Sequence, residues 1–110
     1  MRKIKIGEKE CALHYGQNAI CALEDALDES ISDIFQRLEK GNVCYKDFRA
    51  LLWAGLLKEQ RTLTLEQLGD MCDEAGVRIS DVVPDCIEEL NASFLRLVPD
   101  KAQEEKTKKN

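Results

Sequence analysis

The chain lacks a long apolar run. Its longest apolar stretch is Ala50–Leu57, eight of 110 residues, whereas a membrane-spanning helix needs about 20. Met1–Ile6 begins with basic side chains but has no apolar segment of the kind found in signal peptides. We therefore expect a protein without a membrane span that stays in the cytoplasm.

Cysteine pairs at metal-binding spacing are also missing. The five cysteines are an odd number and include no C-x-x-C pair, whereas disulfide frameworks and zinc sites need even counts or close pairs. The nearest arrangement, Cys11-x-x-His14, places its two side chains on opposite faces of a strand. We expect five reduced cysteines, mostly small core residues, in a reducing compartment, and no metal or other cofactor.

Catalytic motifs are scarce as well. His14 is the only histidine, and nothing near it in the sequence suggests the orienting partner or the cleft that a general base needs. No phosphate-binding glycine loop or nucleophile elbow is present. Four acids at positions 24–29 are typical of a solvated helix face; they are Glu24, Asp25, Asp28 and Glu29. We expect no enzyme, and a metal-dependent enzyme built on this acidic cluster is kept as an alternative.

The charge pattern argues against nucleic-acid binding. The net charge is −5, and residues 1–99 alone carry −6 because the last eleven residues hold four Lys and three acids. Binding to DNA or RNA depends on a clustered basic face, and no Lys/Arg run in residues 1–99 supplies one.

Alternating residues at the start of the chain predict a β-hairpin over residues 2–15. Ile4 and Ile6 share one face of the first strand, and Cys11, Leu13 and Tyr15 share one face of the second. A short connection containing glycine joins the two strands. Because an isolated hairpin is only marginally stable in water, its apolar face must pack on the rest of the chain.

Five helices are predicted after the hairpin, because apolar residues recur at helical spacing between capping and turn signals. The central helix should run from about Tyr45 to Glu59. The predicted N-caps are Asn18, Ser30, Thr64 (in a capping box with Gln67) and Ser80, and the predicted stops are Gly41-Asn42, Gly76 and Pro99.

The central helix is apolar on every side over Ala50–Leu57, so it should lie inside the bundle. Gly55 in its interior costs about 0.8–1 kcal/mol relative to Ala. We expect compensation from the close approach of a neighbouring helix, where a Cβ would clash.

The predicted fold is therefore mainly α, an N-terminal β-hairpin followed by about five short helices packed as a small orthogonal bundle. Residues 1–99 form one domain, with the hairpin over 2–15 and the helical bundle over 18–98. Residues 100–110 form a disordered charged tail.

Some apolar side chains exceed what a core of this size can hold. An exposed apolar patch would mark a protein-binding surface. The candidates for such contacts, each also a candidate for the core, are Trp53, Leu57, Phe94, Leu95 and Val98.

The order of these motifs resembles a known family. The hairpin I-x-I-G-x-K-E at 4–10 is followed by A-L-E-D-A-L at 22–27, I-x-D-I at 31–34, F-R-A-L-L-W-A-G-L at 48–56 and L-T-L-E-Q at 63–67. Over roughly residues 3–97 the chain resembles the phage tail assembly chaperones of the gene-transfer-agent type, from siphophages and prophages.

The resemblance implies a small, mostly helical, non-enzymatic protein that is needed to build a long tail and is absent from the mature virion. Such proteins are thought to coat the tape measure protein and to recruit tail tube subunits in the cytoplasm of the bacterial host. It also implies self-association. A helical module can shield a long helical chain through helix-in-groove contacts. The alternative is a small bacterial helical adaptor or regulator, which would favour a closed dimer over an open oligomer.

Overall fold

The computed structural model describes the backbone of residues 2–97 and the side chains of residues 2–94. The chain begins with an antiparallel hairpin of β1 (Arg2–Ile6) and β2 (Lys9–Leu13), in which Arg2 lies opposite Leu13 and Ile6 opposite Lys9. Gly7, with φ of +67°, supplies the left-handed residue of the turn. The hairpin buries its expected apolar face, which consists of Ile4, Ile6, Cys11, Leu13 and Tyr15.

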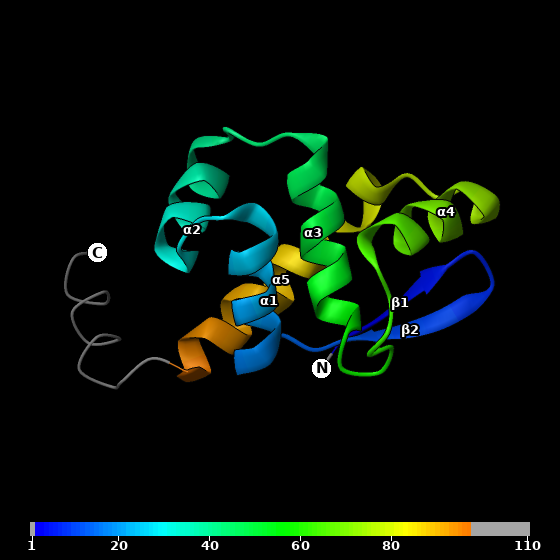
Figure 1. Cartoon of the computed structure of the whole chain (residues 1–110), viewed down its shortest axis with the longest axis horizontal. Coiled ribbons are helices and arrows are strands. Elements are labelled where there is room, and N and C mark those ends of the chain that lie inside the picture. Colours follow the sequence, from blue (N-terminus) through cyan, green and yellow to red (C-terminus); the bar gives the residue numbers. More distant parts are fainter. Residues whose placement is uncertain (1, 98–110) are drawn as a thin grey trace.

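Five helices follow the hairpin, as the sequence predicts. They are α1 (Gln17–Leu27), α2 (Ile31–Lys40), α3 (Tyr45–Leu56), α4 (Leu65–Ala75) and α5 (Ile79–Leu97). Helix α3 lies at the centre, with α1 and α2 on one side of it and α4 and the hairpin on the other, and α5 passes behind (Figure 1). The predicted fold class, mainly α with an N-terminal hairpin followed by five helices, is confirmed, and α5 is the longest of the described helices, with 19 residues.

Several helix boundaries follow local signals that the sequence contains. The Ser30 hydroxyl accepts a hydrogen bond from the Asp33 N–H at 3.1 Å, and Gly41 ends α2 in the left-handed conformation. Thr64 and Gln67 exchange the two 3.0 Å hydrogen bonds of a capping box at the start of α4. These predictions are confirmed, as is the stop at Gly76.

Three other predictions of helix boundaries are wrong. In each case the helix begins earlier than predicted, or a residue distant in the sequence forms a hydrogen bond at the boundary. Helix α1 begins after an extended Gly16, so Asn18 lies inside it. Helix α5 begins at Ile79 rather than after Ser80, because the Ile79 N–H donates to the Tyr45 hydroxyl at 3.0 Å. Helix α3 ends at Leu56 rather than Glu59. The predicted stop at Pro99 lies outside the described residues.

The early end of α3 has a visible cause. The Gly55 carbonyl accepts a hydrogen bond from the His14 N–H at 2.8 Å. In a continued helix that carbonyl would accept the N–H of Glu59, four residues on. The backbone N–H of His14, just after β2, forms a hydrogen bond with this carbonyl instead.

Gly55 is also where the hairpin packs most closely on the helices. A Cβ on Gly55 would lie 2.7 Å from Tyr15 Cζ and 2.8 Å from Leu13 Cδ2. The close approach expected at this glycine is thus present, but the neighbour is the strand segment and not another helix. The Tyr15 hydroxyl then donates to the Leu51 carbonyl at 2.6 Å, which fixes the ring on α3.

Three of the five cysteines fill the core, as expected for most of them. Cys11, Cys72 and Cys86 are buried, whereas Cys21 and Cys44 are exposed, and all five are free thiols. Burial raises the pKa of the Cys86 thiol to about 11, and it also raises the pKa values of Cys11 and Cys72. These three thiols therefore stay neutral and pack as small apolar groups.

Candidate functional site

Trp53 is tied into the fold of its own chain. Its indole is half-buried against the core, and its Nε1 donates to the Leu63 carbonyl at 2.8 Å, just before α4. Tyr45, two helical turns earlier on α3, accepts from Ile79 just after α4. The two aromatic side chains thus fix both ends of α4 on α3.

The other predicted contact residues lie in different places. Leu57 is half-buried in the wall of a cavity at the end of α3. Phe94 packs at the far end of α5 against Phe35 of α2, with ring centroids 4.9 Å apart. The side chain of Leu95 and all of Val98 lie outside the described residues. The three described members therefore do not gather on one surface.

Tyr45 is the one large apolar side chain, among those that the structure describes, that is substantially exposed, at 53%. Its ring stacks edge-on with Phe48 at 5.7 Å. Tyr45 is not among the contact residues that the sequence predicts, because its position at the start of the central helix does not indicate exposure. The other exposed apolar side chains among the described residues are small ones such as Ala26 and Cys21.

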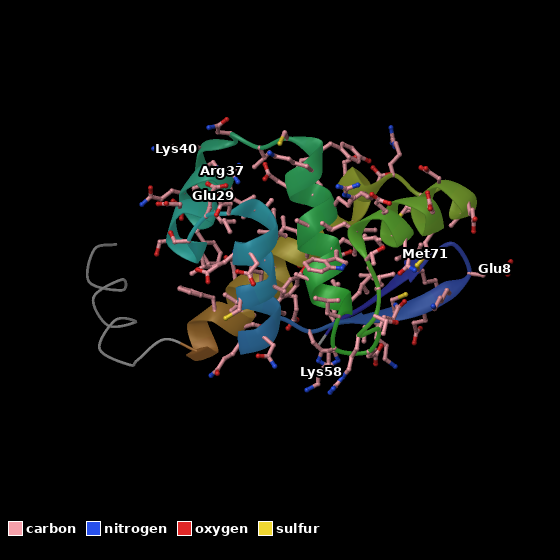
Figure 2. All side chains as sticks on the ribbon, viewed as in Figure 1. Glu8, Glu29, Arg37, Lys40, Lys58 and Met71 are labelled. Carbon is pink, nitrogen blue, oxygen red and sulfur yellow. The ribbon has the colours of Figure 1, made fainter. Side chains whose placement is uncertain are left out.

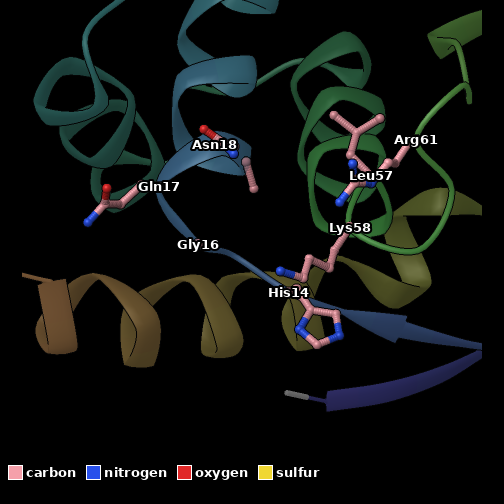
Figure 3. Close-up of a pocket in the computed structure, with 8 residues that line it drawn as sticks. His14, Gly16, Gln17, Asn18, Leu57, Lys58 and Arg61 are labelled. Carbon is pink, nitrogen blue, oxygen red and sulfur yellow. The ribbon is translucent and has the colours of Figure 1, made fainter.

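The cavity beside Leu57 lies where the end of β2, the start of α1 and the end of α3 meet. It measures about 480 Å³. Lys58 extends from the end of α3 toward His14, and Arg61 lies on the same side near Leu57 (Figure 3). The cavity is lined by His14, Gly16, Gln17, Asn18, Ala19, Leu57, Lys58 and Arg61. No feature of the sequence distinguishes the two cations, because surface Lys and Arg are common and their convergence depends on the fold.

A second cavity of about 510 Å³ lies between the 60–63 segment and α4. Its wall combines Leu63 and Met71 with the carboxylates of Asp70 and Glu74 and with three polar side chains. It contains no histidine, cysteine or basic residue, so its lining offers no acid–base pair of the usual catalytic kind.

A charged network joins α2, α3 and the α1–α2 connection at the opposite end of the molecule. Arg37 donates to Glu29 through Nε and Nη2, at 2.8 and 2.5 Å, and to Asp47 through Nη1 and Nη2, at 2.9 and 3.0 Å. Figure 2 shows Glu29 and Arg37 side by side at α2. The Asp47 side chain is only 3% exposed.

This network shifts the pKa values of its members. Hydrogen bonds from Arg37 and from the Cys44 N–H lower the pKa of Asp47 from 3.8 to about 2, although burial opposes the shift. Hydrogen bonds to Asp47 and Glu29 raise the pKa of Arg37 above its ordinary value. The buried pair of Arg37 and Asp47 therefore stays charged at neutral pH and links α2 to α3.

The acidic cluster of residues 24–29 is only partly the solvated face that the sequence suggests. Glu24 is half-buried and accepts the Ile31 N–H at 2.7 Å, which caps α2, and Glu29 is half-buried against Arg37. Asp25 and Asp28 are exposed. Within residues 2–97 no three His, Cys, Asp or Glu side chains are placed to hold a metal ion, so nothing in this region favours the metal-dependent enzyme.

Comparison with known protein families shows the family to which the chain belongs. A family model described as "Phage tail tube protein, GTA-gp10" matches residues 2–96, nearly the whole described chain. The chain belongs to this family. No curated protein and no solved structure matches it. None of the helices within the described residues is long and apolar enough to cross a bilayer.

Proposed function

We propose that this phage tail protein is an assembly chaperone. In this proposal it binds the tape measure protein and helps to recruit tail tube subunits in the cytoplasm of the bacterial host. It has no enzymatic role and leaves before the virion matures. The observation that carries the proposal is a helical, highly charged surface on a member of a tail family.

The character of the surface favours transient contacts over permanent ones. Obligate interfaces bury large apolar areas that resemble a domain core cut in half. Among the described side chains, only Tyr45 exposes a large apolar group beyond half of its area. A surface of this kind suits a protein that binds and is released during assembly.

Half-buried apolar side chains supply the contacts that such a chaperone needs. Helix-in-groove recognition uses apolar residues at helical spacing, and Trp53 and Leu57 lie four residues apart on and just after α3, where both are half-exposed. Phe94 offers a second contact at the other end of the molecule. Two separate contacts would allow one face to hold the tape measure protein and another to hold a second copy of the chain.

A tail tube subunit is the second candidate, and the description of the family favours it. A tube subunit must present two complementary surfaces that repeat along the tube. It must also remain in the finished particle. The two candidates therefore differ in where the protein is found after assembly.

Co-expression tests the chaperone directly. We expect the tape measure protein of the same phage to be insoluble when expressed alone and to copurify with this chain when both are made together. Leu57→Ser should weaken the copurification at least five-fold while the protein stays folded. Ala26→Ser, at an exposed position on α1, is the matched control and should have no effect.

Mass spectrometry of purified tails separates the two candidates. A chaperone should be absent or present in trace amounts. If the chain is instead the repeating component of the tail, and if the purified protein polymerises into tubes unaided, it is a tube subunit and the chaperone proposal is wrong.

A further inference from the structure

The cavity beside Leu57 concentrates positive charge in an acidic protein. Lys58 and Arg61 both line it, with His14 between β2 and α1, and none of its lining residues is acidic. Glu59 lies between the two cations in sequence but does not line the cavity. The chain as a whole carries a net charge of −5.

Neither cation is paired with an acid within the described residues. Four other basic residues there do form ion pairs, Arg2 with Asp85 and Glu88, Lys3 with Glu10, Arg37 with Glu29 and Asp47, and Arg78 with Asp81. The remaining described cations, Lys5, Lys9, Lys40, Lys46 and Arg49, also form no ion pair, but none of them lines this cavity. Within residues 2–97, Lys58 and Arg61 have no such acid and no side-chain hydrogen bond. Their charges are therefore available to a ligand.

The shape of the cavity limits what that ligand can be. A volume of about 480 Å³ is at the small end of ligand pockets. Leu57 and Ala19 give part of the wall an apolar surface, and the cations lie beside it (Figure 3). This combination matches a Glu side chain, whose methylene groups pack on the apolar wall while its carboxylate meets Arg61 and Lys58. Arginine binds carboxylates with two parallel hydrogen bonds.

We propose that this cavity binds an acidic segment of a partner protein and seats one of its carboxylates between Lys58 and Arg61. The net charge of −5 disfavours non-specific binding of an acidic segment elsewhere on the chain, and a carboxylate seated in the cavity would hold the partner in one register. The inference deepens the proposed function, because it gives the chemistry by which the partner is recognised.

A short peptide tests the cavity without knowledge of the partner. The probe is the tetrapeptide Ac-Glu-Glu-Glu-Glu-NH₂, titrated into ¹⁵N-labelled protein and followed by NMR. We expect the amide signals of residues 16–19 and 57–61 to shift, and Ac-Gln-Gln-Gln-Gln-NH₂ to leave them in place. Shifts spread over the whole surface, or none at all, overturn the proposal.

Charge reversal provides the matched comparison. The double variant Lys58→Glu, Arg61→Glu should weaken peptide binding at least ten-fold. The control Lys40→Glu, Lys46→Glu changes the net charge equally, and Lys40 lies at the upper left of the view, away from Lys58 at the bottom (Figure 2); binding should change less than two-fold. All four residues are exposed, and thermal melts check that both variants fold. Equal weakening in the two variants contradicts the proposal.

Two further readouts separate possible causes of failure. If inorganic phosphate shifts the same amides and the tetraglutamate peptide does not, the cavity is a small-anion site and the proposal fails. If the peptide binds but the tape measure protein does not copurify, the proposed binding site is supported and the proposed chaperone function is wrong. If the same amount of tape measure protein copurifies with the Lys58→Glu, Arg61→Glu variant, the chaperone function is supported. The proposal that the cavity binds the partner is then wrong.

Discussion

The two ends of α3 are held in place by different kinds of interaction. At its start, Asp47 is buried and pairs with Arg37, which also binds Glu29. At its end, Gly55 packs against Tyr15 and Leu13 so closely that a methyl group would not fit. One end depends on charge and the other on shape.

The difference has consequences for tolerance to change. A buried charge that loses its partner retains its full desolvation cost, so the charged end is sensitive to single substitutions and to pH. The packing of Gly55 on Tyr15 and Leu13 depends on shape and not on a buried ion pair, and its density leaves no room for an added atom. Substitutions at the start of α3 should therefore destabilise the protein by leaving a buried charge unpaired, and substitutions at Gly55 should do so by steric overlap.

The largest effect should come from Asp47→Ala. The substitution removes the buried partner of Arg37 and the acceptor of the Cys44 N–H. Breaking a buried ion pair typically costs about 3–5 kcal/mol; we expect about 3 kcal/mol, because Glu29 still binds Arg37. Urea unfolding at pH 7 measures the loss. Asp25→Ala, at an exposed acid on α1, should change the free energy of unfolding by less than about 0.5 kcal/mol.

Acid should weaken the same end by a slightly smaller amount. The pKa of Asp47 is about 2 in the folded protein and 3.8 ordinarily. A depressed folded pKa gives stability that is complete above pH 3.8 and is lost as the pH falls through 2. The loss should reach about 2 kcal/mol. Urea unfolding between pH 5 and pH 2 tests this, and in Asp47→Asn that contribution should vanish; an unchanged profile would show that another carboxylate is responsible.

Gly55→Ala probes the apolar end. Overpacking costs about 1–3 kcal/mol, and the gain in helix propensity returns about 0.8–1 kcal/mol, so we expect a net loss of up to about 2 kcal/mol that is the same at pH 7 and pH 5. Gly69→Ala, inside α4 where a Cβ meets nothing within 4 Å, is the control. It should stabilise the protein by up to about 1 kcal/mol. If both variants gain stability, the packing at Tyr15 is not tight.

The smallest effect should come from Trp53→Phe. It keeps a ring but removes the N–H that donates to the Leu63 carbonyl. A neutral hydrogen bond contributes about 1 kcal/mol, and we expect a loss of that size in thermal unfolding, with no pH dependence. A loss above about 3 kcal/mol would mean that the indole ring itself is core.

Much of the secondary structure could be predicted because its signals lie within a few residues. Thr64 caps an N–H three positions away, and Gly41 and Gly76 end helices through their own conformations. Helix boundaries were predicted wrongly where a residue distant in the sequence forms the hydrogen bond at the helix end. Tyr45 fixes the start of α5 across the fold, and His14 takes the carbonyl that would have extended α3.

The candidate site could be predicted less well. Leu57 was selected for its apolar character, and the structure places it in the wall of a cavity. The two cations beside it were not selected, because nothing in the sequence separates Lys58 and Arg61 from other surface charges. Tyr45 was missed for the same reason: exposure depends on which neighbours cover a side chain.

The sequence by itself determined the element order, the mainly α class, most helix caps and the resemblance to a tail family, because these depend on residue type and short spacing. Only the tertiary structure decided which segment lies against Gly55, that Arg37 joins α2 to α3 through Asp47, and that Lys58 and Arg61 meet at one cavity. These contacts join residues far apart in the chain. Their geometry exists only once the core has brought the elements together.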